Sequence, residues 1–293
     1  MGTVANMMTG VTRVGPFAQR WTERGVGPRV LLLHGIYAGA NGDEWAHLVP
    51  HLRTQRAVRV PDLLGCGASD RPDLEYTPEV VLAAVETLIR DAGRGVHVVA
   101  SSLTAAYAVR AIAQGAEVSR LTLITPTGLG RAQTRPVSSA GRLLYSLGRH
   151  TPLGDLVTLA LGSRFSVRWF LEHQAYGNPG KVTDAVVDSY HHATHQTNAK
   201  HLALAFVIGG LTLALDDTEV KQCEPDVLWA GADGFSPKAD AQAWTDARAH
   251  VVIFEGVGLP QAEVPEIVAD LIVGDWRREP VGRIHSDRPD VPR

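Results

Sequence analysis

Residues 96–107 have the sequence VHVVASSLTAAY, in which a short apolar run ends at two serines and passes directly into a helical pattern. The run Val96–Ala100 predicts a strand buried on both faces, as in a parallel sheet, and Leu103–Gln114 predicts the helix that follows. Ser102 stands at the sharp turn between them. A side chain at such a turn is presented above the edge of the sheet. Ser102 is therefore the first candidate for chemistry, although a serine there can also simply cap the helix.

Short apolar runs alternate with amphipathic helical patterns along most of the chain. This alternation predicts βαβ units and a mostly parallel, doubly wound sheet, with an antiparallel hairpin at its edge from Val11–Glu23. The other predicted strands are Arg29–Leu33, Ala57–Val60, Leu121–Ile124, Val227–Trp229 and Val251–Phe254. The other predicted helices are Glu44–Leu52, Pro78–Ala92, Pro237–Arg248 and Pro265–Val273.

Residues 131–220 break this alternation, because they contain helical patterns and no predicted strand. Thr151-Pro152 and Asn178-Pro179 divide them into three or four helices. We therefore expect a core formed by residues 1–130 and 221–276, with a helical lid of residues 131–220 inserted between its two parts. The polar, proline-rich residues 277–293 are expected to be a disordered tail.

Two further turns follow predicted strands, at the sheet edge where open parallel sheets bind ligands. His34-Gly35 follows the first of these strands, and residues 61–72, PDLLGCGASDRP, follow the second. Together with residues 100–104, ASSLT, they resemble in order and spacing the HG turn, the PDLxGxGxSD loop and the G-x-S-x-G nucleophile elbow of the α/β-hydrolase superfamily. The resemblance implies the α/β-hydrolase fold and places Ser102 in the register of the nucleophile.

The resemblance also implies other parts of a catalytic site. The backbone N–H of Leu103 and that of Ile36 or Tyr37 would form an oxyanion hole. Residues 227–237, VLWAGADGFSP, resemble the family's WGxxDxxxP, which places Asp233 on the catalytic acid. The other interpretation of Asp233 is a surface aspartate in a turn that starts a helix.

The position of the catalytic histidine departs from the family pattern. Where the family usually has a GxGHLPxxE-like turn, residues 256–263 are GVGLPQAE, so Leu259 takes the place of the histidine or the histidine is deleted. A serine hydroxyl is a poor nucleophile without a neighbouring base, and losing a triad member costs orders of magnitude in rate. The sequence therefore disfavours ordinary Ser-His-Asp hydrolysis.

Histidines of the lid are candidates to replace the missing base, although packing or solvent exposure is the commoner role for such residues. The i, i+4 spacing of His191 and His195 also suits a metal, but no carboxylate partner accompanies them, so we expect no metal and no cofactor. Aromatic residues of the lid and core are expected either to line a pocket or to belong to the core. The predicted substrate-binding residues are His34, Ser101, Tyr107, Trp169, His173, His191, His195 and Leu259.

Composition limits the class of protein. A net charge of −3 without a basic stripe argues against nucleic acid as a partner. Residues 1–10, MGTVANMMTG, lack the pattern of a signal peptide, and the apolar stretch 202–215 is too short to cross a bilayer. We expect a cytoplasmic protein with two free thiols, without a membrane partner, that acts on a hydrophobic small molecule; a homodimer stays open.

Three functions remain open from the sequence. The first is an atypical enzyme that catalyses a non-hydrolytic reaction: lyase, cyclising, C–C coupling or acyl-transfer chemistry. The excess of arginine over lysine is typical of high-GC bacterial genomes, which favours natural-product tailoring by analogy alone. The second is a serine hydrolase of esters, thioesters or epoxides that uses a lid histidine. The third is a protein that binds a small molecule without chemistry.

Overall fold

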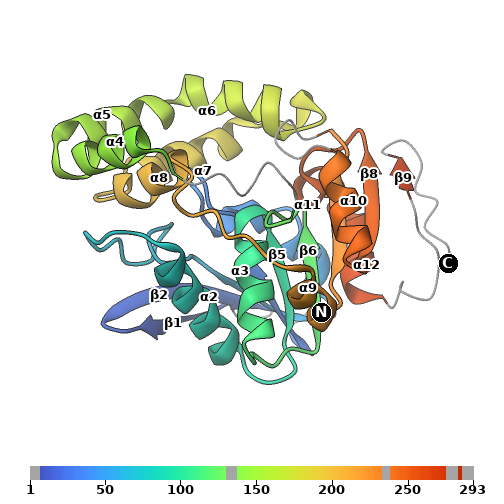
Figure 1. The fold of residues 1–293 in the computed structure, drawn as a ribbon. Helices are drawn as coiled ribbons and strands as arrows, with labels where there is room; N and C mark the ends of the chain where they lie inside the picture. Colours follow the sequence, from blue (N-terminus) through green and yellow to red (C-terminus); the bar gives the residue numbers. More distant parts are fainter. Residues whose placement is uncertain (1–6, 130–136, 233–237, 275–282, 286–293) are drawn as a thin grey trace.

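A nine-stranded sheet forms the centre of the computed structural model, which describes residues 7–129, 137–232, 238–274 and 283–285 (Figure 1). Its strand order is β1-β2-β4-β3-β5-β6-β7-β8-β9. The two pairings made by β2 are antiparallel and all others are parallel, which confirms the predicted fold class and the predicted edge hairpin. The strands are β1 Met8–Val14, β2 Phe17–Arg24, β3 Arg29–Leu33, β4 Ala57–Pro61, β5 His97–Ser101, β6 Arg120–Ile124, β7 Asp226–Ala230, β8 His250–Glu255 and β9 Arg283–His285.

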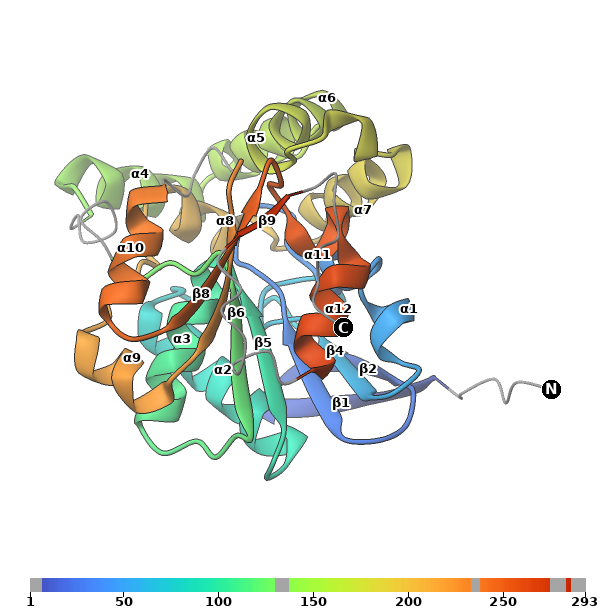
Figure 2. The same cartoon turned by 90° about the vertical axis from the view of Figure 1, so that its right-hand side faces the viewer.

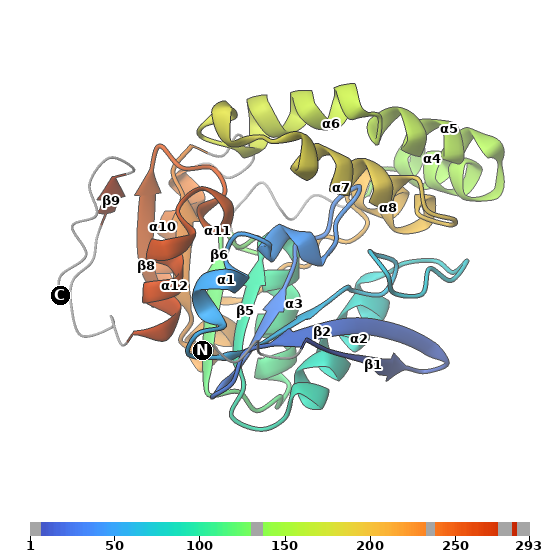
Figure 3. The same cartoon turned by 180° about the vertical axis from the view of Figure 1, so that it is seen from behind.

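Helices cover both faces of this sheet, and each face has its own hydrophobic core (Figure 2). Successive residues of a strand point to opposite faces, so Leu31 and Leu33 of β3 contribute to one core while Val30 and Leu32 contribute to the other. The first face is covered by α2 Pro78–Ala92, α3 Ser102–Ala113, α9 Asp217–Cys223 and α10 Lys238–Asp246. The second is covered by α1 Val49–Leu52 and α12 Pro265–Val273, seen in front of the sheet in Figure 3.

Residues 139–207 form a separate layer of helices above the carboxyl ends of the strands (Figures 1 and 3). We call these residues the helical layer. No strand occurs among the described residues between β6 and β7, as the sequence predicts. The elements of the layer are α4 Ser139–His150, α5 Pro152–Leu161, α6 Arg164–Phe170, a π-helix Leu171–Ala175, a 3-10 turn Pro179–Lys181, α7 Asp184–Thr194 and α8 Lys200–Val207.

Three predictions about the elements and their boundaries need correction. The boundary at residues 220/221 falls inside α9, which packs against α3 and therefore belongs with the core. Within the tail predicted to be disordered, Arg283–His285 form β9, because their backbone pairs in parallel with Ile253–Glu255 of β8. A single helix predicted over Glu44–Leu52 is instead a 3-10 turn, Gly42–Trp45, followed by α1.

Two further expectations concern cysteines and membranes. Cys66 and Cys223 are both free, as predicted. Across the described part of the chain, no helix combines the length and the apolar character needed to cross a bilayer.

Candidate functional site

Ser102 lies where β5 passes into α3, and its backbone has a positive φ of 51°. Residues with a β-carbon avoid this region, at a cost of about 1–2 kcal/mol. Such strain persists only where the surrounding structure enforces it, and it gathers at functional sites. The turn after β6 repeats the feature, because Thr125 has a φ of 43°. The sequence analysis missed Thr125, since a threonine after a strand carries no local signal of strain.

Both strained residues line one pocket between the carboxyl edge of the sheet and the helical layer. We call it the elbow pocket; its volume is about 350 Å³. Most of its lining follows the ends of β3, β5, β6 and β8, or comes from the layer above. The lining residues are Ile36, Tyr37, Glu44, Ser101, Ser102, Leu103, Ile124, Thr125, Thr127, Phe170, Ala175, Tyr190, Phe206, Gly209, Leu211, Thr212, Leu259 and Gln261. Six predicted site residues are thus brought together: Ile36, Tyr37, Ser101, Ser102, Leu103 and Leu259.

Two backbone N–H groups near Ser102 have no hydrogen-bond acceptor among the described residues. Leu103 lies in the first turn of α3, where N–H groups have no acceptor within the helix. The N–H of Ile36, directly after the HG turn, meets no hydrogen-bond acceptor in the described structure. Gly35 allows this turn to approach the elbow, because a β-carbon there would lie 3.2 Å from Cβ of Ser102. The oxyanion hole itself stays a prediction.

Two predicted substrate-binding residues of the core lie outside the pocket lining. His34 is fully buried, its Nδ1 lies 2.8 Å from the Gly35 carbonyl, and its Nε2 accepts from the N–H of Leu63 at 3.0 Å. It therefore fastens the HG turn to the loop after β4. Tyr107 is also fully buried and donates to the carbonyl of Leu211 at 2.6 Å. Their predicted contact with substrate is corrected to a structural role.

The four predicted binding residues of the helical layer are not brought into the pocket lining either. Trp169 is 50% exposed and stacks on His173, whose Nδ1 lies 2.9 Å from the Trp169 carbonyl. His191 pairs with the Gly162 carbonyl at 2.8 Å, and His195 with the His191 carbonyl at 2.7 Å. His191 thus joins α7 to the end of α5, whereas His173 and His195 each bond to a carbonyl four residues earlier in their own helical segment. Helical periodicity could not show which face of the layer meets the sheet.

Asp233, the predicted acid, lies outside the described residues and stays a prediction. The two residues before it are described: Gly231 donates to the Phe254 carbonyl at 2.9 Å and Ala232 to the Val257 carbonyl at 3.1 Å. The turn after β7 is therefore held against the loop after β8. In the described part of the chain, no group of three or more histidine, cysteine, aspartate or glutamate residues is arranged to hold a metal ion.

The loop after β8, where the family histidine is expected, packs directly against the helical layer. A β-carbon on Gly258 would lie 2.0 Å from the Ala175 carbonyl oxygen, and one on Gly177 would lie 2.2 Å from the Gly256 carbonyl oxygen. Backbone therefore packs directly on backbone. Leu259, the next residue, does line the pocket, so an aliphatic side chain occupies the place where a base is expected.

A buried carboxylate holds this contact together. Glu263 is 4% exposed, and its two oxygens accept from the N–H groups of four residues on both sides of the contact at 2.8–3.0 Å. The donors are Gly177, Asn178, Gly258 and Leu259. Hydrogen bonds to a charged acceptor are worth about 1.5–3 kcal/mol each, so Glu263 is a strong link between core and layer.

The carboxylate that lines the elbow pocket is that of Glu44, which the sequence analysis did not single out. Its Oε2 accepts from the N–H of Gly35 at 2.9 Å and from the hydroxyl of Tyr37 at 3.0 Å. Its Oε1 accepts from Nε2 of Gln261 at 3.0 Å. All three partners are donors, which suits an ionised carboxylate.

Two tyrosines extend this network into the helical layer. The hydroxyls of Tyr37 and Tyr190 lie 3.2 Å apart and their rings stack, with centroids 5.4 Å apart. Burial, with the charge of Glu44 as a second cause, raises the pKa of both hydroxyls well above the usual value. Both tyrosines therefore stay protonated around neutral pH, and Tyr37 keeps its donor role toward Glu44.

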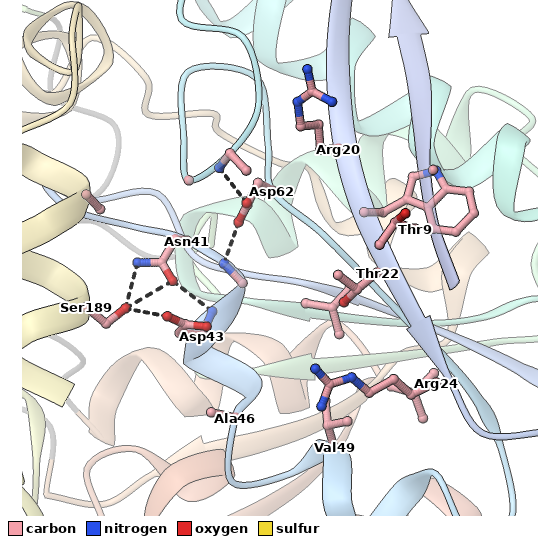
Figure 4. Close-up of a pocket in the computed structure, with 18 of the residues that line it drawn as sticks. Thr9, Arg20, Thr22, Arg24, Asn41, Asp43, Ala46, Val49, Asp62 and Ser189 are labelled. Atoms are coloured by element: carbon pink, nitrogen blue, oxygen red, sulfur yellow. Dashed lines mark hydrogen bonds between the residues drawn. The ribbon is translucent and has the colours of Figure 1, made fainter. Parts of the chain in front are cut away.

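A larger groove of about 970 Å³ is lined in part by Asn41 and Asp43, which precede Glu44 in the chain (Figure 4). Figure 4 shows Ser189 of α7 joined to Asn41 and Asp43, with its hydroxyl 2.7 Å from Oδ2 of Asp43. Asp62 accepts from the N–H groups of Gly42 and Ala68 at 2.7 Å. These polar groups satisfy one another and tie the helical layer to the core, whereas the elbow residues lie in the smaller pocket.

Comparison with known proteins agrees with this fold. A sequence profile described as the Alpha/beta hydrolase family matches residues 30–271, so the chain belongs to that family. Among curated proteins, 66 residues are 38% identical to a 2-hydroxy-6-oxo-6-(2'-aminophenyl)hexa-2,4-dienoic acid hydrolase of Metapseudomonas resinovorans, over 22% of this chain and 23% of that protein. A stretch of 153 residues is 34% identical to an uncharacterized protein of Mycobacterium tuberculosis, over 47% and 44% of the two chains. The chain thus spans under half the length of either relative.

Solved structures show the same fold at low sequence identity. A serine hydrolase involved in carbazole degradation superposes with a TM-score of 0.74 and 19% identity, over 94% of this chain and all of that one. A meta-cleavage product hydrolase from Pseudomonas fluorescens IP01 gives a TM-score of 0.71 at 20% identity, over 94% and 98% of the chains. These likenesses concern the fold alone.

Proposed function

We propose that the protein is a hydrolase of small, largely apolar carbonyl compounds that works without the histidine of the usual triad. The observation that carries this proposal is the strained Ser102, which lines a partly open pocket together with Ile36 and Leu103. Similar proteins named as hydrolases support hydrolysis as the type of reaction. The substrate is bound between the sheet edge and the helical layer.

In this proposal, backbone N–H groups provide the main catalytic effect. The substrate's carbonyl oxygen accepts from Ile36 and Leu103, which stabilises the charge that develops when the hydroxyl of Ser102 or a water attacks the carbonyl carbon. An oxyanion hole and substrate binding alone retain a rate advantage of roughly 10³–10⁴ over water after a triad is lost. We therefore expect substrates with good leaving groups, such as activated esters and thioesters.

A non-hydrolytic reaction is the second candidate, covering the lyase, cyclising, coupling and acyl-transfer reactions expected from the sequence. It is favoured by one observation: no histidine is found among the described residues that line the elbow pocket. Such a site is sufficient for a reaction that requires an oriented substrate and a polarised carbonyl group but no deprotonated serine. The lid histidines that the alternative of an ordinary serine hydrolase requires are engaged in contacts within the helical layer.

A fluorophosphonate probe and p-nitrophenyl butyrate together test the proposal. We expect slow labelling of Ser102 and slow ester turnover above background, both abolished in Ser102→Ala. Ser146→Ala, which changes an exposed serine of α4, is the matched control and should behave as the unchanged protein. Turnover at rates typical of serine esterases would contradict the proposal that Ser102 works without a neighbouring base. Absence of both labelling and turnover would favour the second candidate, a non-hydrolytic reaction.

A further inference from the structure

The elbow pocket contains two hydrogen-bond acceptors with unused capacity. Gln261 is fully buried, its Nε2 donates to Glu44, and its Oε1 has no hydrogen-bond partner among the described residues. The amide orientation is fixed by chemistry, since only the NH₂ end can donate to a carboxylate. A buried acceptor without a partner costs free energy, so such groups in native proteins call for an explanation.

The carboxylate of Glu44 divides its two oxygens between two tasks. Oε2 accepts both bonds that hold the HG turn, from Gly35 and Tyr37. Oε1 accepts a single bond, from Gln261. Because each carboxylate oxygen offers about two lone-pair sites, Oε1 can accept a second donor. Its free site and the unpaired Oε1 of Gln261 belong to neighbouring side chains that both line the pocket.

The charge on this part of the pocket is negative. Among the described residues that line it, Glu44 is the charged side chain, and there is no lysine, arginine or histidine to offset it. A carboxylate that lines a pocket attracts a cation or a neutral donor and repels an anion. A relative with local similarity is named as a hydrolase of a dienoic acid. An acidic group of that kind would meet repulsion beside Glu44.

We propose that Glu44 and Gln261 form an acceptor site that binds a hydrogen-bond donor of the substrate, an ammonium or a hydroxyl group, and rejects substrates with a carboxylate there. The substrate class is therefore an apolar carbonyl compound with a donor group at one end. The inference rests on the proposed function in that it concerns the same pocket. The acceptor site specifies a donor group on the substrate in addition to the carbonyl group that the oxyanion hole would bind.

Matched ligands that need no catalysis test the acceptor site. We choose 4-phenylbutylamine, 4-phenylbutan-1-ol and 4-phenylbutanoate, which differ in their end group, and titrate each calorimetrically into the full chain. The amine should bind at least about tenfold more tightly than the carboxylate, as expected for a hydrogen bond to a charged acceptor, with the alcohol between them. Comparison of the amine with the alcohol shows whether the site prefers a cationic or a neutral hydrogen-bond donor.

Variants assign the selectivity to the two residues. Glu44→Gln keeps the shape but removes the charge, so the amine-to-carboxylate affinity ratio should fall to near one. Asp43→Asn removes the same charge one residue away, on the side facing the groove, and should leave the ratio unchanged. Gln261→Met keeps Glu44 and removes the unpaired acceptor, so alcohol binding should weaken several-fold; this variant also covers the case in which Glu44→Gln does not fold.

Three outcomes would overturn the proposal: equal affinity for amine and carboxylate, no binding of any of the three ligands, or a ratio that Glu44→Gln leaves intact. The titrations and the ester assay, both carried out on the unchanged protein, separate this inference from the proposed function. Amine preference without ester turnover contradicts the proposed function alone. Turnover without amine preference contradicts the acceptor site alone.

Discussion

Backbone strain at Ser102 has a measurable energetic consequence at the scale of one residue. Glycine adopts positive φ without the steric cost that a β-carbon brings, although it loses more chain entropy on folding. We predict that Ser102→Gly is more stable than Ser102→Ala by about 0.5–1 kcal/mol, measured by urea unfolding of both variants. Equal stability, or a more stable alanine variant, would show that the turn holds Ser102 without strain.

Position 259 offers a direct test of the missing base. Leu259 lines the elbow pocket, so Leu259→His should bring an imidazole to the side of the pocket where the family has its base. A positioned general base contributes typically about 10²–10⁴-fold. We therefore predict at least about tenfold faster fluorophosphonate labelling of Ser102, with a dependence on pH near neutrality.

Gly258→His is the matched control for that experiment. It introduces the same side chain one residue earlier, where a β-carbon would overlap the Ala175 carbonyl. This variant should lower the melting temperature and leave the labelling rate unimproved. Equal labelling rates of both histidine variants and the unchanged protein would contradict the assignment of position 259.

Residues whose role depends on neighbours in the chain could be predicted from the sequence, whereas long-range partners could not. The placement of Ser102 follows from a strand that runs directly into a helix, which is local information. Glu44 and Gln261 meet across 217 residues of sequence, and nothing near either residue predicts the other. His34 illustrates the reverse case: its motif was recognised, but its role is to fasten the turn.

At the scale of elements, Glu23 of β2 joins three strands through buried ion pairs. It is 2% exposed and accepts from Arg59 of β4 at 2.8 Å and from Arg29 of β3 at 2.9 Å. Burial alone would raise the pKa of Glu23, but the hydrogen bonds and charges of the two arginines outweigh it and lower the pKa below 4.5. Stabilisation from a carboxylate with a lowered pKa is present above its unfolded pKa and is lost as the pH falls through the folded value.

We therefore predict that Glu23→Gln is less stable than the unchanged protein by about 2 kcal/mol at pH 7, and that the difference shrinks below about pH 4.5. Urea unfolding at pH 7 and pH 4 measures both quantities. Glu117→Gln, an exposed glutamate paired with Arg94, should change stability little at either pH. Parallel pH curves for Glu23→Gln and the unchanged protein would contradict the argument.

Elements of the core were predictable because their burial leaves a clear pattern. Strands buried on both faces appear as continuous apolar runs, as in Val96–Ala100, so most were found within a residue or two. The boundary of α9 and the short strand β9 were not found. The packing of α9 on α3 is a tertiary contact, which the local sequence does not reveal. Strand β9 has only three residues and is stabilised by its pairing with β8.

At the scale of the molecule, two of the contacts that fasten the helical layer to the core can be removed one at a time. Glu263 binds the backbone of residues 177 and 178 on one side, and Ser189 binds the loop of Asn41 and Asp43 on the other. We predict that Glu263→Gln lowers stability by about 1–3 kcal/mol, since an amide accepts fewer of these hydrogen bonds. Hydrogen exchange should increase most in residues 171–182, which lose their anchor.

Ser189→Ala is the comparison for that experiment. It removes the hydroxyl at the second attachment and should raise exchange in α7 while leaving residues 171–182 protected. A uniform increase over the whole chain in Glu263→Gln would show global destabilisation, and would contradict a separately attached layer.

The contact between Gly258 and the backbone of residues 175–177 also bears on how such a protein changes over evolutionary time. A histidine is not accommodated at position 258 while the helical layer keeps its place, because any side chain there meets the Ala175 carbonyl. An imidazole would enter this loop at position 259, or only after the layer had moved. The fold thus keeps its pocket while it restricts the positions at which this loop can gain a base.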